Sequence, residues 1–186
     1  LTRLLKSDDA GLSRAAARSL AGLGHEEVEV LLRARLDSKH AGNRIDAAFA
    51  LGLMQERIGV MTLDGFLEEV DGPYADGVSA AGALAELGRT NGLAYLAELL
   101  KPSDKKWRNA AIDALGASKA PRAILPLAAL LEDPSPATRL RVIEALETVG
   151  GDRAAFELRR QRDDSEPEVR RAIRFARARL GDYVLP

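Results

Sequence analysis

Apolar residues recur along this chain at intervals of three and four, which places them on one face of an α-helix. The stretch 123–132 is typical, because its leucine, isoleucine and alanine residues keep helical spacing up to the turn at Asp133 and Pro134. Nothing in the sequence alternates with the period of a β-strand. Six glycines fall at or near the expected helix ends, where a left-handed residue often closes a helix. They are Gly24, Gly52, Gly88, Gly116, Gly150 and Gly181.

The apolar segments come in pairs, so the pattern predicts an all-α protein with two helices in each repeating unit. The expected helix pairs cover residues 1–6 and 10–23, 25–37 and 40–54, 57–70 and 73–88, 91–101 and 105–117, 120–132 and 135–149, and 152–163 and 167–180.

One motif marks the second helix of each pair. An Arg is followed by a small or apolar residue three positions later and by Ala-Leu six and seven positions later, as in 107–116 and 43–52. The Arg stands at positions 14, 44, 108, 139 and 170, at spacings of 30, 64, 31 and 31 residues. Gly77 occupies the place of the missing Arg. A single helix pair cannot bury its apolar stripe alone, so the period predicts a stacked array.

These residues resemble the HEAT-repeat family in its short form, often called the PBS-lyase HEAT-like repeat. The resemblance rests on 133–139, on 166–170 and on the Ala-Leu-Gly endings at 50–52 and 114–116. It implies a right-handed α-solenoid, an α-α superhelix of about six two-helix repeats in a single array, with second helices on the concave face. It also implies an Asp–Arg ladder between neighbouring repeats, interrupted at Gly77. The repeats are expected at 1–24, 25–55, 56–89, 90–118, 119–151 and 152–183.

The positions one and five residues after each Arg are expected to line the concave face, opposite the core. They give an apolar patch, an acidic middle and a basic end, which suits a segment of a partner protein. The alternative is that Ile45, Phe49 and Leu140 pack against adjoining helices, because an apolar residue on a helix is usually core. The expected partner-binding residues are Ile45, Phe49, Val78, Asn109, Asp113, Leu140, Glu144, Arg171 and Phe175.

The composition narrows the function classes. The 186 residues have a formal net charge of −1, no Cys and two His, and 46% are hydrophobic. Such a balance gives no overall field for nucleic acid or an anionic membrane, and no apolar run approaches the ~20 residues of a membrane span. Without Cys there is no disulfide, thiol nucleophile or zinc–thiolate site. We therefore expect no catalytic residues, no cofactor and no membrane association.

Two groups of residues resemble functional sites of other HEAT-like proteins, but each group is incomplete. HEAT-like deoxyhypusine hydroxylases hold iron with repeated His-Glu pairs, whereas this chain has one such pair, His25-Glu26, and His40 is followed by Ala41. Trp107 and Asp113 invite comparison with HEAT-like DNA alkyl-base glycosylases, but six residues separate them, so they lie on different faces of a helix. A metal site is therefore not expected.

The expected function is a non-enzymatic scaffold or adaptor that binds a protein segment. Two alternatives stay open, namely an accessory subunit of a bilin-lyase-type enzyme, and nucleic-acid binding through the Arg-rich repeat at 136–186, which holds eleven Arg and nine acids. The chain starts at Leu1, so we expect a piece of a longer protein. A cytoplasmic location is a default expectation.

Overall fold

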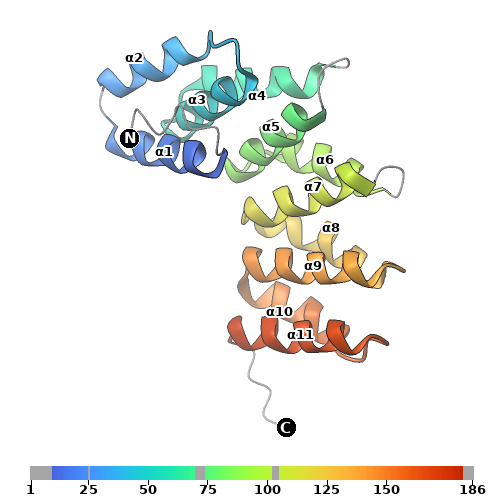
Figure 1. The fold of residues 1–186 in the computed structure, drawn as a ribbon. Coiled ribbons are helices and arrows are strands. Elements are labelled where there is room, and N and C mark those ends of the chain that lie inside the picture. The colour runs from blue at the N-terminus through green and yellow to red at the C-terminus, as the bar shows by residue number, and fades with distance from the viewer. Residues whose placement is uncertain (1–9, 25, 70–73, 102–104, 182–186) are drawn as a thin grey trace. The chain divides into compact units, whose positions relative to one another are not determined.

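The structure is a computed structural model that describes residues 10–24, 26–69, 74–101 and 105–181. These residues form helices and short turns without strands, which confirms the all-α prediction (Figure 1). The helix predicted over 1–6 lies outside the described residues. The α-helices are α1 (Ala10–Leu23), α2 (Glu26–Arg35), α3 (Ala41–Leu53), α4 (Arg57–Glu68), α5 (Tyr74–Glu86), α6 (Thr90–Leu99), α7 (Lys105–Ala117), α8 (Ile124–Ala128), α9 (Pro136–Val149), α10 (Gly151–Arg160) and α11 (Pro167–Arg179).

One predicted helix is broken. The segment 120–132 forms a 3₁₀ turn at Pro121–Ala123, the short helix α8 and a second 3₁₀ turn at Ala129–Glu132. Pro126 has no backbone N–H to donate, and it is tolerated only in the first turn of a helix. The chain therefore starts α8 two residues before Pro126 instead of running one helix through it.

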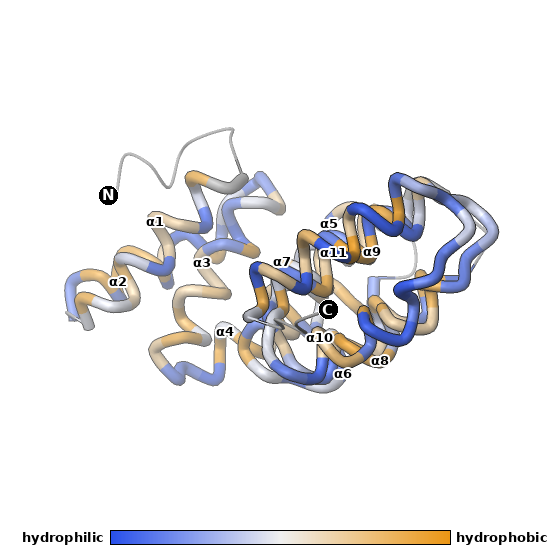
Figure 2. Tube along the Cα trace, turned by 90° about the horizontal axis from the view of Figure 1, so that it is seen from below, coloured by the Kyte–Doolittle hydropathy of each residue, from blue (hydrophilic) through white to orange (hydrophobic). Residues whose placement is uncertain are grey.

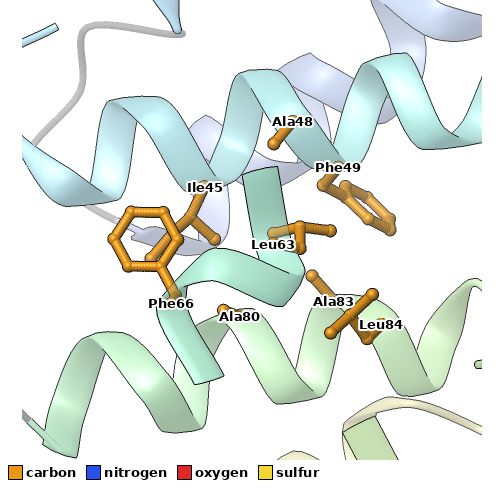
Figure 3. Packing of buried hydrophobic residues seen from close by; sticks show 8 residues of the cluster. All are labelled: Ile45, Ala48, Phe49, Leu63, Phe66, Ala80, Ala83 and Leu84. Atoms are coloured by element: carbon orange, nitrogen blue, oxygen red, sulfur yellow. The ribbon is translucent and has the colours of Figure 1, made fainter. Parts of the chain in front are cut away.

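Contacts divide the chain into two compact units, Leu1–Gly92 and Leu93–Pro186, which we call unit 1 and unit 2. In unit 1, α3 packs against α1, α2, α4 and α5. Ile45, Ala48 and Phe49 of α3 meet side chains of both α4 and α5 (Figure 3). The rest of this cluster is Leu63 and Phe66 of α4 with Ala80, Ala83 and Leu84 of α5.

Unit 2 is built of two layers of helices. The second helices α7, α9 and α11 form a stack in which α9 contacts both α7 and α11, and α8 and α10 form the layer of first helices (Figures 1 and 2). Figure 2 looks along this stack, so the helices of each layer project onto one another. Ala111, Val142 and Ile173 of the second helices are fully buried. The apolar stripe of each helix is therefore covered by its own partner and by the neighbouring pair.

Glycines allow the closest helix approaches. A Cβ on Gly59 of α4 would lie 2.3 Å from the carbonyl oxygen of Ala48, and one on Gly116 of α7 would lie 2.9 Å from the Cβ of Ala145 in α9. Neither distance leaves room for a methyl group. These two glycines therefore set the spacing of α4 on α3 and of α7 on α9.

Candidate partner-binding surface

In α3, a set of positions packs against the following helix pair. Counted from the repeat Arg, these are positions one, four, five and eight. Ile45, Ala48 and Phe49 occupy the first three in α3, and they pack on α4 and α5. Gly116 occupies position eight of α7, and its backbone lies against Ala145 of α9. Positions one and five of α3 therefore face the core and not an open surface.

This register corrects the prediction for unit 1. Ile45 is 1% exposed, Phe49 is 0% exposed and Val78 is 7% exposed. The predicted apolar patch on an open face does not exist there, because these side chains are part of the core (Figure 3). The alternative, packing against adjoining helices, holds for Ile45 and Phe49.

Phe49 is also covered from α1. The guanidinium carbons of Arg14 and Arg18 lie 5.6 Å and 5.7 Å from the centre of its ring, which are cation–π distances. The Nε atom of Arg14 lies 3.5 Å from a carboxylate oxygen of Asp46, and Arg18 forms an ion pair with Glu86. Arg14 and Arg18 thus cover the position at which the sequence predicted an exposed aromatic ring.

In unit 2 the predicted positions are more open. Asp113, Glu144 and Phe175 stand at position five of α7, α9 and α11, and all three are exposed. At position one, Asn109 and Leu140 are half-buried, whereas Arg171 is exposed. The structure thus brings Asp113 and Glu144 to the same open side of two stacked helices.

Ion pairs between neighbouring second helices partly neutralise this side. Nη1 of Arg141 in α9 donates to both carboxylate oxygens of Asp113 in α7, at 2.7 Å and 2.6 Å. Arg179 of α11 donates to Glu147 of α9 at 2.7 Å. Both pairs are largely exposed, and such pairs contribute at most about 1 kcal/mol to stability. The sequence did not predict either pair, because their spacings of 28 and 32 residues depend on the helix register.

A second set of Arg–Asp contacts is buried and structural. Arg139 donates from Nε and Nη2 to the two carboxylate oxygens of Asp164, both at 2.8 Å. One repeat earlier, Arg108 donates from Nη2 to one carboxylate oxygen of Asp133, and its Nε donates to the carbonyl oxygen of Leu100 at 2.7 Å. Each Arg also donates to carbonyl oxygens of a preceding turn, as Arg139 does to Asp133 at 2.8 Å. This is the predicted ladder. The rung at Gly77 has no Arg, and residues 70–73 before it lie outside the described residues.

The ladder changes the ionisation of its members. Burial raises the pKa of Asp164, but hydrogen bonds from Arg139 and from the backbone N–H of Glu166 outweigh it, so the pKa of this carboxyl lies below its ordinary value. Burial also raises the pKa of Asp133, but hydrogen bonds from the backbone N–H of Ser135 and from Arg108 outweigh it. The pKa of Asp133 therefore also lies below its ordinary value. The hydrogen bond to Asp164 raises the pKa of Arg139. All of these groups are therefore charged at neutral pH.

The remaining candidates for chemistry are not assembled into a site. Within the described ranges, no three His, Asp or Glu residues come together in a metal-binding group, and no helix is long and apolar enough to span a membrane. His40 precedes α3 as an exposed residue, and His25 lies outside the described residues. A pocket of about 400 Å³ lies between α8, the following 3₁₀ turn and α10. Its buried acid, Glu157, is already paired with Arg153 at 2.8 Å and Arg160 at 3.3 Å.

The repeat register and the ladder agree with a comparison against family models. A model described as HEAT repeats matches residues 63–135 and 93–177, which together span more than half of the chain. The chain belongs to the HEAT-repeat family. The HEAT ladder in unit 2 runs through the region of the match. A search of curated proteins finds no match to this sequence.

Several solved structures are similar to this chain. Human deoxyhypusine hydroxylase in complex with glycerol is 19% identical, with a TM-score of 0.53 over 96% of this chain and 82% of that chain. A designed armadillo repeat protein in complex with the peptide (KR)4 is 17% identical, with a TM-score of 0.48 over 96% and 97%. The complex of CpcE and CpcF of phycocyanin lyase from a Nostoc species is 26% identical, with a TM-score of 0.49 over 83% and 65%. The similarity to the hydroxylase, with its TM-score of 0.53, supports the fold and not an activity.

Proposed function

We propose that this HEAT-repeat chain is a non-enzymatic interaction scaffold, and that α7 and α9 bind a segment of a partner protein on their open side. The observation that carries the proposal is the row of side chains there, which we call the second-helix face. It consists of Asp113, Arg141, Glu144 and Thr148, of which Arg141 is half-buried and the others are exposed. Two stacked helices thus present polar groups at a regular interval.

The charges on this face favour a segment that carries basic residues. Glu144 makes no ion pair with any described residue. Asp113 is paired, but its side chain remains 57% exposed and that of Arg141 40% exposed. Since an exposed pair is weak, an incoming Lys or Arg can compete for Asp113 while a second basic residue meets Glu144.

The helices that carry this face are already fixed before binding. Arg139 at the start of α9 is held by Asp164 and by the carbonyl of Asp133, and Arg108 at the start of α7 is held by Asp133 and the carbonyl of Leu100. A rigid surface loses little conformational entropy when a ligand binds. The ladder therefore supports recognition without touching the ligand.

The test is affinity capture from a lysate of the source cells. We expect the protein to capture a partner that the charge-reversed variant Asp113→Arg/Glu144→Arg no longer captures. The matched control is Glu98→Arg/Asp152→Arg, which reverses two exposed acids on the first helices α6 and α10. Equal capture by all three proteins would place the interface elsewhere and refute the proposed face.

Circular dichroism must first show that the three proteins are equally helical. Ile45, Phe49 and Val78 are unsuitable positions for this test, because they are buried and their substitution disturbs the core. The two alternative functions have direct readouts. A bilin-lyase subunit would bind a coloured tetrapyrrole, and a nucleic-acid binder would be retained on heparin with a steep dependence on salt.

A further inference from the structure

Exposed apolar residues recur at one register position of the first helices. A residue with left-handed backbone angles, φ between 52° and 77°, stands in the turn before each of these helices, namely Gly24, Gln55, Gly88, Lys119 and Gly150. Six positions after each of them follows an exposed apolar residue, namely Val30, Met61, Ala94, Leu125 and Phe156. Single exposed apolar residues are common on protein surfaces and need no explanation. A residue that returns in the same register in every repeat instead indicates a shared surface.

The exposure of this position does not depend on where the array ends. Leu125 is 59% exposed although α10, the next first helix, lies beside α8 (Figure 1). Phe156 stands at the same position of α10 and is 46% exposed. Since each repeat contacts its neighbours in the same register, a further first helix would leave Phe156 as open as α10 leaves Leu125.

In unit 2 a hollow lies between the two large residues of this set. It has a volume of about 400 Å³, and it is lined by apolar residues of 125–131 on one side and by Arg153 and Arg160 of α10 on the other. The guanidinium carbon of Arg153 lies 5.5 Å from the centre of the Phe156 ring. We call the hollow, together with Leu125 and Phe156, the α8–α10 groove. Its volume lies in the range of about 300–1,000 Å³ that is typical of ligand sites.

A buried acid holds the two arginines of the groove in place. Glu157 is 5% exposed, and its two carboxylate oxygens lie 2.8 Å from Nη2 of Arg153 and 3.3 Å from Nη1 of Arg160. The arginine side chains themselves remain 58% and 67% exposed. A guanidinium carries five N–H donors, so both arginines keep donors for a further carboxylate. The groove thus presents two fixed positive groups above one buried negative group.

The exposed charges around the groove are mainly basic. One helical turn before and after Leu125 and Phe156, the exposed charged residues are Arg122, Asp152, Arg153, Arg159 and Arg160. The same turns around Val30 and Met61 of unit 1 carry the charged residues Glu26, Glu27, Arg33, Arg57 and Asp64. The apolar position is therefore common to both units, whereas its basic surroundings belong to unit 2.

We propose that the α8–α10 groove binds an acidic amphipathic helix of a partner protein. The apolar stripe of that helix packs between Leu125 and Phe156 and fills the hollow, as amphipathic helices do in apolar grooves. Its carboxylates pair with Arg153 and Arg160, which are already oriented. The hollow favours a partner side chain over a bilayer surface, which has no projecting group to fill it. The groove lies on the first helices, so its binding does not depend on the function proposed for the second-helix face.

The experiment uses a fluorescein-labelled designed peptide of about 18 residues, helical and amphipathic, with Glu on both sides of a Leu/Ala stripe and a length near 27 Å. A second peptide has Lys in place of each Glu. Fluorescence anisotropy should show saturable binding of the Glu peptide and weaker binding of the Lys peptide. Leu125→Ser/Phe156→Ser should weaken binding of the Glu peptide about tenfold or more at unchanged net charge. Arg160→Gln should also weaken it, while Glu157 keeps Arg153 as its partner.

The matched control is Val30→Ser/Met61→Ser, which removes exposed apolar side chains at the same register position of unit 1. Circular dichroism must show that this control and the variants are as helical as the parent protein. The control should leave the affinity for the Glu peptide unchanged. Equal weakening in the control, no effect of Leu125→Ser/Phe156→Ser, or no saturable binding of the Glu peptide would overturn the proposal.

Two further measurements distinguish other occupants of the groove. Co-sedimentation with vesicles of phosphatidylserine and phosphatidylcholine that is lost in Leu125→Ser/Phe156→Ser would overturn the proposal in favour of a membrane surface. Self-association in analytical ultracentrifugation that is lost in the same variant would overturn it in favour of a second copy of this chain. We expect neither result.

Discussion

At the scale of single residues, arginine has three different roles in this chain. Arg139 is buried and bidentate on Asp164, Arg14 and Arg18 lie over the Phe49 ring, and Arg171 is exposed on α11. The repeat motif placed Arg139 and Arg170 in equivalent positions, and the structure confirms that both bind turn carbonyls. Sequence position therefore predicts this role for Arg139 and Arg170, but not for Arg14, which holds the same motif position and pairs with Asp46.

The Arg139–Asp164 pair makes stability depend on pH. Asp164 has a lowered pKa in the folded chain, so its contribution is fully present above the ordinary Asp value of about 3.9 and is lost as the pH falls through the lower folded value. Asp164→Asn removes the charge and leaves Arg139 buried without its partner. We expect a loss of about 3 kcal/mol at pH 7 and a shallower decline of stability in acid than in the parent protein.

Urea unfolding followed by circular dichroism between pH 7 and pH 3 measures both effects. The control is Asp113→Asn, which removes the exposed pair with Arg141 and should cost less than about 1 kcal/mol. A loss in Asp164→Asn as small as that in the control would contradict a stabilising role for the buried pair.

The sides on which individual residues lie were harder to predict. Asp113 and Glu144 at position five are exposed as the spacing indicated, but Phe49 at position five of α3 and Ile45 at position one are buried. A helical spacing shows which residues share a face, and it does not show that α4 and α5 cover positions one, four and five of α3. The amino-acid types gave a better indication here, since Ile and Phe are core residues more often than surface residues.

At the scale of helices, the sequence predicts where a helix occurs better than it predicts whether that helix runs unbroken. Helices α1, α4, α7 and α11 begin at the predicted residue, and outside 120–132 the other predicted helix ends differ by at most three residues. The exception is 120–132, where Pro126 falls within an otherwise helical apolar pattern. The pattern of apolar residues continues through such a break, because 3₁₀ turns also bury one face.

Helix α4 contains two glycines with opposite expected effects on stability. Gly65→Ala should stabilise the protein by about 0.5–1 kcal/mol, because a Cβ there meets open space and Ala favours the helix. Gly59→Ala should instead destabilise it by about 1–3 kcal/mol, since the new methyl lies 2.3 Å from the Ala48 carbonyl oxygen and forces α4 away from α3.

Thermal or urea unfolding of the two single variants measures this difference within one helix. Both substitutions make the same chemical change, so helix propensity cancels in the comparison. Stabilisation by Gly59→Ala would mean that α3 and α4 are not in the close contact that the structure shows.

At the scale of the whole molecule, stability should be local, because each helix pair of a repeat array depends mainly on its neighbours. Phe49→Ala empties a fully buried site of unit 1 and should cost about 3–5 kcal/mol. Hydrogen exchange followed by mass spectrometry should then show lost protection in α3, α4 and α5, with little change in α9 and α11. Ile143→Ala, which truncates a side chain of α9 that is 1% exposed, should give the reverse pattern. Equal loss of protection throughout the chain in either variant would show that the two units unfold as one cooperative body, and the nearest-neighbour description would then be wrong.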